Sequence, residues 1–427
     1  MLEGASQLKT HSEIIPDLLA KIDSLPIDRD SIPQEALDLA NKERSSLFPW
    51  RGQFSPQLIE LLLSRYANSD SVILDPFVGS GTTLFEAVKL NLECWGVEIN
   101  PAAFQMAKTA EFGNLKRTER AKYISRAKEI LGQCLPGAYG LKSSASLHAI
   151  SASQIGELIA RSREDSLVHN LIVNAVMRHS LLSDKEAELS ESLDAHCKLV
   201  EGLPIANKRC RVFLGDARKL PNEQESVDLV VTSPPYINVF NYHQNYRPVM
   251  ELDGWDLLEV AKSEIGSNRR NRGNRFLTVV EYAIDMLSSL QELARVLKPE
   301  GRAIMVVGRQ SSVRGIQFEN YRIISCLAEG GAGLELVNRQ ERRFVNRFGE
   351  RIIEDLLHFK RGALKVRNPE GFGRVVGRVF LEQALPMSPS DVVSGELGDA
   401  ISRYQSVFPA PLFKGEMDGR NSEVKQA

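Results

Sequence analysis

Residues 71–90, SVILDPFVGSGTTLFEAVKL, decide the fold class of this chain. They begin with a short apolar run, continue into a turn that contains Gly79 and Gly81, and end in an amphipathic stretch. This order predicts a strand, a glycine-rich turn and a helix. Glycine lets the backbone approach a ligand closely, and ligands of open α/β sheets lie beyond the carboxyl ends of the strands. We therefore expect a ligand-binding turn directly after this strand.

Four more apolar runs follow the same scheme, each ending in a polar or proline-rich loop. They are ECWGVEIN (93–100), CRVFLGDARKLP (210–221), SVDLVVTSPPYIN (226–238) and GRAIMVVGRQ (301–310). A helical pattern precedes the last of them, and the segments 334–338 and 351–359 are expected to close the sheet. Strands that alternate with helices predict a mostly parallel, doubly wound α/β sheet.

The interval between the second and third strands is too long for one βα repeat, which needs about 30 residues for the whole βαβ unit. We therefore expect a helical insertion there. The expected segments are an N-terminal helical stretch over 1–44, interrupted by Pro16, Pro26 and Pro33, the α/β catalytic domain over 45–100 and 211–362, the helical insertion over 101–210, and a glycine- and proline-richer, partly disordered tail over 363–427.

Composition excludes several classes of protein. The chain has 427 residues, with 53 Lys and Arg against 55 Asp and Glu, so any nucleic-acid contact must come from local basic patches. No apolar run reaches the roughly 18 residues of a membrane span, and the start lacks the pattern of a signal peptide. Five scattered cysteines without a CxxC pair argue against a zinc ribbon or a disulfide scaffold. We expect a cytoplasmic protein without a membrane partner and without a metal.

Two acids stand at the ends of the second and third strands. A carboxylate at Glu98 can accept both ribose hydroxyls of a nucleoside, and one at Asp216 can accept from an adenine amino group. The turn after the first strand lacks both the third glycine of a dinucleotide fingerprint and the lysine of a P-loop, so neither NAD nor ATP is favoured. Polar residues at three successive strand ends indicate a different nucleoside ligand.

The fourth strand ends in Thr232-Ser233-Pro234-Pro235-Tyr236. The tetrapeptide Ser233-Pro234-Pro235-Tyr236 and the motif D-P-F-x-G-S-G-T, which residues 75–82 match in full, resemble the motifs of the S-adenosylmethionine-dependent DNA amino-methyltransferases. The resemblance implies a Rossmann-like methyltransferase fold with a seven-stranded sheet, and S-adenosylmethionine as cofactor. The residues that it implies for cofactor binding are Phe54, Asp75, Pro76, Phe77, Gly79, Ser80, Gly81, Thr82, Glu98 and Asp216, with Glu98 on the ribose and Asp216 on the adenine.

The chemistry of the reaction explains the residue types of the catalytic loop, Ser233, Pro234, Pro235 and Tyr236. An exocyclic amine is a poor nucleophile because its lone pair is delocalised into the base. The Ser233 hydroxyl and the Pro234 carbonyl can accept its hydrogens, and the two prolines hold these acceptors in place. Tyr236 offers a flat face for a base that has been flipped out of the duplex.

The identity of the loop residues also bears on the methylated atom. Methylation of cytosine C5 needs a cysteine after a proline in its own family, and no cysteine here follows a proline. Serine at the first position of the tetrapeptide favours cytosine N4 over adenine N6 by resemblance. The cofactor motif precedes the catalytic motif in this chain, whereas many serine-type members have the reverse order.

Two basic stretches are candidates for nucleic-acid contact. Arg269, Arg270, Arg272 and Arg275 stand without an intervening acid in the segment 238–276, which follows the catalytic loop and is expected to contact phosphates as a substrate-recognition loop. The second stretch, 116–128, has six basic residues against Glu119, although such a helical face is commonly just solvated.

The sequence thus predicts an enzyme that methylates an exocyclic amine of DNA, in the setting of a restriction-modification pair with a nuclease encoded nearby. Two alternatives stay open. One is an RNA base N-methyltransferase, because the fold does not separate DNA from RNA substrates. The other is an inactive methyltransferase-fold subunit that binds nucleic acid.

Overall fold

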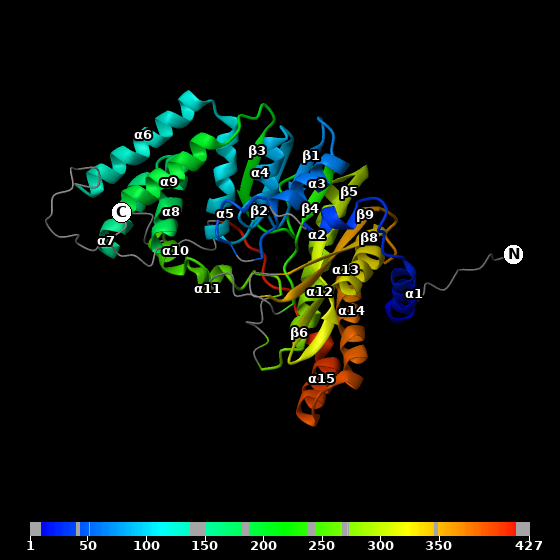
Figure 1. The fold of residues 1–427 in the computed structure, drawn as a ribbon. Coiled ribbons are helices and arrows are strands. Elements are labelled where there is room, and N and C mark those ends of the chain that lie inside the picture. The colour runs from blue at the N-terminus through cyan, green and yellow to red at the C-terminus, as the bar shows by residue number, and fades with distance from the viewer. Residues whose placement is uncertain are drawn as a thin grey trace. The chain divides into compact units, whose positions relative to one another are not determined.

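The computed structural model describes residues 10–39, 43–50, 52–136, 150–181, 188–237, 244–266, 271, 273–345, 349–366 and 368–415 (Figure 1). The chain forms two compact units. Unit 1 comprises Met1–Glu43, Ala217–Phe240 and Lys262–Leu412, and unit 2 comprises Arg44–Asp216, Asn241–Ala261 and Phe413–Ala427.

The strands give the predicted α/β architecture. The three strands of unit 2 pair in parallel, and they are β1 (Val72–Asp75), β2 (Glu93–Glu98) and β3 (Cys210–Leu214). Those of the sheet in unit 1 are β4 (Val227–Thr232), β5 (Leu297–Gly308), β8 (Leu334–Val345) and β9 (Arg351–Arg361). β4 and β5 are parallel, whereas β9 runs antiparallel to both β5 and β8. The seven-stranded order β3-β2-β1-β4-β5-β9-β8 confirms the mostly parallel, doubly wound sheet.

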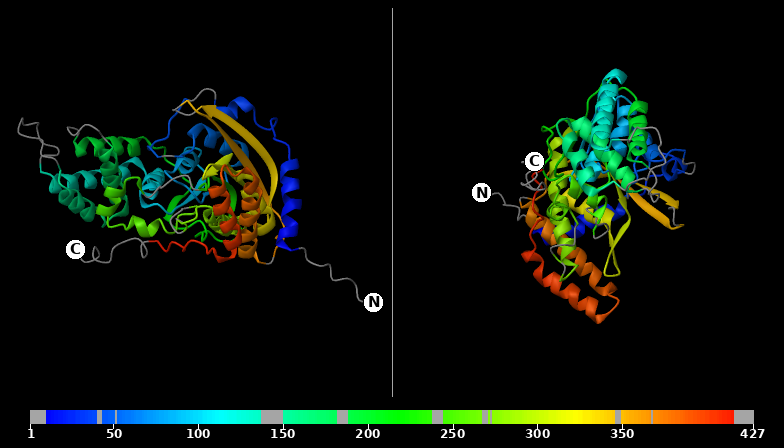
Figure 2. Two further views of the ribbon diagram at one scale, coloured as in Figure 1. Left: turned by 90° about the horizontal axis from the view of Figure 1, so that it is seen from below. Right: turned by 90° about the vertical axis from the view of Figure 1, so that its left-hand side faces the viewer.

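Unit 2 is mainly helical outside its strands. Its longer helices are α3 (Pro56–Tyr66), α4 (Thr82–Lys89), α5 (Pro101–Lys108), α6 (Arg117–Cys134), α7 (Ala152–Ser162), α8 (Ser166–Ser180) and α9 (Leu189–Gly202). Of these, α5 to α9 stand between β2 and β3 in the chain, and every element described in that interval is helical. The cyan and green helices α6 to α9 pack against one another (Figures 1 and 2). The expected insertion is therefore a helical layer with its own core, which includes Leu171 and Leu193.

The segment after the catalytic loop joins this helical layer. It contains α10 (Arg247–Leu252) and α11 (Leu257–Val260). Asp253, which is fully buried, accepts from the Arg163 guanidinium at 3.2 Å and from the Trp255 indole at 3.1 Å. The ring of His169 lies 3.4 Å from the same carboxylate. His169 is thus a structural residue, as its lack of ligand spacing predicts.

The N-terminal residues cover the free edge of β8. Helix α1 (His11–Ser24) continues through Pro16, so this proline does not interrupt it as we expected. After it, the Asp28 amide donates to the Arg339 carbonyl at 2.7 Å, and residues of α2 (Gln34–Asp38) bond to the backbone of β8 further along. These contacts pair backbone groups that an edge strand would otherwise expose.

The C-terminal region differs from the expected tail. It forms α14 (Pro369–Ala384) and α15 (Asp391–Arg403), drawn in orange and red in Figures 1 and 2. Two glycines of α14 allow close packing on α12 (Leu277–Val296), because a Cβ added at Gly377 would lie 2.7 Å from the Cα of Val280 and one at Gly373 would lie 3.1 Å from the Cα of Ile284. Glycines that indicate a loop in the sequence are therefore, at these two positions, part of a helix contact in the fold. Residues 416–427, the part expected to be disordered, lie outside the described residues.

Among the described residues, no helix is long and apolar enough to cross a membrane. All five cysteines are buried and unbridged, which agrees with their predicted role as small apolar residues.

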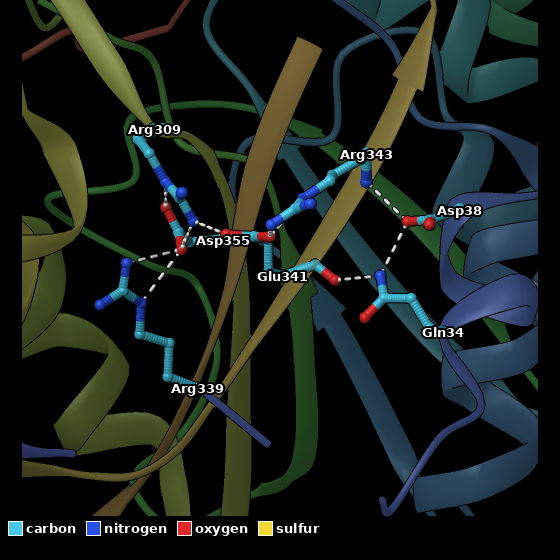
Figure 3. Close-up of polar contacts among 7 residues, drawn as sticks. All are labelled: Gln34, Asp38, Arg309, Arg339, Glu341, Arg343 and Asp355. Carbon is cyan, nitrogen blue, oxygen red and sulfur yellow. Dashed lines mark hydrogen bonds and ion pairs between the residues drawn. The ribbon is translucent and has the colours of Figure 1, made fainter. Parts of the chain in front are cut away.

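A buried ion-pair network joins β5, β8 and β9 within unit 1 (Figure 3). Asp355 on β9 is fully buried and accepts from Arg309 at 2.8 Å and from Arg339 at 2.9 Å. Glu341 on β8, also buried, receives the guanidinium groups of Arg309 and Arg343. The Asp355 and Glu341 carboxylates raise the pKa of Arg309. The network therefore fixes the chain at Arg309, one residue beyond Gly308, the last residue of β5.

We expect Asp355→Ala to lower the free energy of unfolding by about 3–5 kcal/mol, because it leaves two guanidinium groups without their shared buried partner. Urea unfolding followed by circular dichroism measures this loss. The matched control is Glu157→Ala, which removes an exposed pair with Arg161 and should change stability by less than about 1 kcal/mol. Equal losses in the two variants would contradict a structural role for the buried network.

Candidate cofactor and catalytic site

The glycine loop between β1 and α4 is held by the first acid of its own motif. The Asp75 carboxylate is buried and accepts the Thr83 hydroxyl at 2.6 Å and the Phe77 amide at 3.1 Å. Gly79 and Gly81 both have positive φ, of 53° and 93°. A Cβ at Gly81 would lie 2.7 Å from the Cα of Ala107, so this glycine is needed where α4 meets α5. Asp75 and Gly81 therefore shape the loop, and direct cofactor contact by them stays a prediction.

Gly79 is different because its free side is not closed by backbone. The nearest atoms to a Cβ added there belong to the Trp50 side chain, at 3.6 Å. Next to it, Ser80 is buried and donates its hydroxyl to Gln53 at 2.9 Å. The backbone of Gly79 therefore faces the Trp50 side chain with no side chain of its own between them.

Glu98, at the end of β2, lies against this loop. One of its carboxylate oxygens accepts the Gly79 amide at 2.8 Å, and the other accepts the Asn100 amide, also at 2.8 Å. The Glu98 carbonyl accepts the Gly215 amide at 2.9 Å, which brings Asp216 to the same edge. One carboxylate therefore ties the glycine loop after β1 to the turn after β2.

Asp216 is nearly fully buried, and its carboxylate accepts the Phe413 amide at 3.0 Å. A C-terminal residue of unit 2 therefore covers Asp216, the predicted cofactor residue after β3. Phe413 could not be predicted, because it follows a proline-rich stretch and no sequence motif marks it.

Two residues that precede α3 contact the glycine loop: Trp50 lies beside Gly79, and Gln53 accepts the Ser80 hydroxyl. We predicted that Phe54 would contact the cofactor from this segment. Phe54 is half-buried, and its carbonyl accepts the Ser46 hydroxyl at 3.0 Å. Its assignment to the cofactor stays a prediction. A tryptophan five residues before the expected α3 cap, in FPWRGQFSP, is the signal that identifies Trp50 in the sequence.

The catalytic loop follows β4 in unit 1. The hydroxyl groups of Ser233 and Tyr236 lie 3.3 Å apart. The Tyr236 ring lies over Gly308 at the end of β5, where an added Cβ would be 3.3 Å from the ring. Burial, and the nearby Glu354 carboxylate, raise the pKa of Tyr236 to about 12, so its hydroxyl stays neutral at physiological pH.

Gly266 supports this loop from the segment that follows it. Its φ is 75°, and an added Cβ would lie 2.9 Å from the carbonyl oxygen of Tyr236. The sequence analysis did not single out Gly266, because the contact joins residues that are 30 positions apart.

The two basic stretches predicted to contact nucleic acid differ in how much of each is described. Arg269, Arg270 and Arg272 lie outside the described residues, and Arg275 is exposed. In the second stretch, Arg120 is fully buried and donates to backbone carbonyls, including that of Val200 at 3.0 Å. Lys128 pairs with Asp194 at 2.6 Å. The expectation that Arg120 belongs to an exposed basic face is therefore wrong, because its guanidinium is buried among backbone carbonyls.

Within unit 2 the arrangement fits a nucleoside ligand with a polar tail. It combines the backbone of Gly79, which carries no side chain and whose amide is held by Glu98, with a carboxylate at the end of β2 and a second carboxylate just after β3. Among the residues that the structure describes, no group of three metal-ligating side chains is present.

Comparison with known proteins points in the same direction. Residues 33–109, which include the glycine loop and Glu98, match the N6_N4_Mtase family of DNA methylases. The type II methyltransferase M.MjaII of Methanocaldococcus jannaschii is 40% identical over 67 residues, which is 15% of this chain and 13% of that protein. The type II methyltransferase M.AvaI of Nostoc is 21% identical over 387 residues, covering 70% of this chain and 75% of that protein.

Among solved structures, a SAM-dependent methyltransferase from Methanosarcina mazei covers 70% of this chain and 96% of its own, with 12% identity and a TM-score of 0.32. The likeness to known proteins therefore depends on the sequence matches, and the family match includes the glycine loop. They confirm the resemblance predicted from the motifs: this chain is similar to DNA methylases of the N6_N4_Mtase family and to type II DNA methyltransferases.

Proposed function

We propose that this chain is a DNA methyltransferase that transfers a methyl group from S-adenosylmethionine to an exocyclic amine of a flipped base, with cytosine N4 favoured over adenine N6. The observation that carries the proposal is the Ser233-Pro234-Pro235-Tyr236 loop at the carboxyl end of β4, in a chain whose glycine loop matches DNA methylases.

The residues of unit 2 would hold the cofactor, whose sulfonium supplies an activated methyl group. Gly79 gives the polar tail access to the backbone. Glu98, which holds the loop through the amides of Gly79 and Asn100, accepts from the ribose hydroxyls. Asp216 accepts from the adenine amine. Asp75 and Gly81 keep the loop in shape, and Phe54, Pro76, Phe77, Ser80 and Thr82 complete the proposed set of cofactor-binding residues.

The catalytic loop supplies acceptors for the hydrogens of the target amine. The Ser233 hydroxyl and the Pro234 carbonyl draw these hydrogens aside, and the nitrogen lone pair is then less delocalised into the base. Tyr236 keeps its proton, since its pKa is about 12. It therefore acts through its ring, which stacks on the base, and through its bond with Ser233.

The substrate is tested directly by incubating unmethylated DNA, and in parallel RNA, with the protein and methyl-labelled cofactor. Chromatography of the nucleosides then identifies the product. N4-methylcytosine in DNA is the expected result, N6-methyladenine would reassign the base, and label in RNA alone would favour the RNA alternative. Absence of label from both would leave the inactive-subunit alternative.

The two relatives are named as type II methyltransferases. On that basis we propose that this chain protects host DNA from a nuclease encoded nearby. The Arg269, Arg270, Arg272 and Arg275 cluster is the proposed phosphate contact, with loss of affinity at high salt as its signature.

Gly79→Val is expected to weaken binding of S-adenosylmethionine at least tenfold, because the branched side chain fills the free side of the loop. Its stability loss should stay near the roughly 1–2 kcal/mol of a left-handed non-glycine residue. Isothermal titration measures the affinity. Gly81→Ala is the matched comparison, since its Cβ meets backbone at 2.7 Å and should mainly cost stability. Undiminished binding by the Gly79 variant would contradict the proposed cofactor loop.

Ser233→Ala should lower kcat by about 10²–10³, the usual effect of a lost transition-state acceptor. Tyr236→Phe should lower it less, because the stacking ring stays, whereas Tyr236→Ala should lower it more. All three should bind cofactor normally. Single-turnover methylation assays separate these outcomes. Full activity of Tyr236→Ala would exclude the base-stacking role.

A further inference from the structure

An aromatic pair connects the segment after the catalytic loop to the glycine loop, entirely within unit 2. The rings of Trp50 and Tyr246 are stacked, with 6.4 Å between their centroids and an angle of 7° between their planes. The Tyr246 hydroxyl donates to the Pro49 carbonyl at 3.2 Å. On its other contact, the Trp50 indole lies 3.6 Å from the position of a Cβ at Gly79. Trp50 is therefore bounded by Tyr246 and by the cofactor loop.

The backbone at Tyr246 is strained. Its φ of 56° lies in the left-handed region, which non-glycine residues rarely adopt, and it directly precedes α10. Such a conformation persists only where the surrounding contacts determine it, and it is common at functional sites. Here those contacts include the stacked ring and the bond to Pro49.

The anchoring of α10 explains why Tyr246 can act as a fixed support. Asp253, at the end of α10, is fully buried and bonds to Arg163 and to Trp255. Residues 247–260 are thereby docked on the helical insertion, and Tyr246 extends from this docked piece toward Trp50. The insertion, to which the motifs assign no function, thus supports the pair.

We propose that Tyr246 is a positioning residue that holds Trp50 against the glycine loop and thereby strengthens binding of S-adenosylmethionine at that loop. The proposal rests on the proposed function, because it needs the cofactor to bind beside Gly79.

The affinity of S-adenosylmethionine is measured by isothermal titration. Tyr246→Ala should weaken cofactor binding roughly three- to tenfold, the range expected from loss of an aromatic pair. Tyr246→Phe keeps the stack and should bind like the wild type.

A double-mutant cycle with Trp50→Ala distinguishes positioning from direct contact. If Tyr246 acts through Trp50, the double variant should be no weaker than the Trp50 single variant. Additive losses would overturn the positioning role. Tryptophan fluorescence gives a readout that does not depend on activity, since Trp50→Phe should remove the emission change that the cofactor causes.

Thermal unfolding guards against a folding defect, and Phe408→Ala, at a residue of unit 1 that is 67% exposed, serves as an aromatic truncation outside the pair. Unchanged cofactor affinity in a folded Tyr246→Ala protein would overturn the positioning role. A wild type that does not bind S-adenosylmethionine would instead contradict the proposed function, and the change that Tyr246→Ala causes in Trp50 emission would still test the positioning role.

Discussion

The carboxylate of Glu98 is the constraint on which the cofactor half of this molecule depends. It accepts the amides of Gly79 and Asn100, so one side chain fixes both the glycine loop after β1 and the turn after β2. The left-handed backbone at Gly79 is stable only in combination with such bonds, because nothing in a glycine itself selects that conformation. The loop geometry, the exposure of bare backbone and the approach of Trp50 all follow from this contact.

The supporting residues around the site lie on elements that the motifs do not include. Phe413 holds Asp216, Gly266 lies against the carbonyl of Tyr236, and Arg309 is held by Asp355 directly after the strand that carries Gly308. Each of these contacts restricts a side chain or a loop that is proposed to touch ligand. A methyltransferase that adds no covalent intermediate depends on such positioning for much of its rate.

Several arginines of this chain serve the fold and are not available to bind nucleic acid. Arg120, Arg218 and Arg339 are buried and bond to carbonyl groups or carboxylates of the protein. The nearly balanced sequence charge is consistent with this use. The proposed nucleic-acid contact thus depends on few residues.

The sequence by itself determined the order of strands and helices, the nature of the glycine loop and the chemistry of the Ser-Pro-Pro-Tyr loop. These features are local, since apolar periodicity, turn residues and short motifs act over a few positions. The C-terminal helices could not be predicted in this way, because Gly373 and Gly377 indicate a loop in the sequence but allow close packing on α12 in the fold. Trp50 with Tyr246, and Asp216 with Phe413, join residues almost 200 positions apart. Tertiary structure alone decided these pairs, because no local pattern records which distant side chain fills a given space.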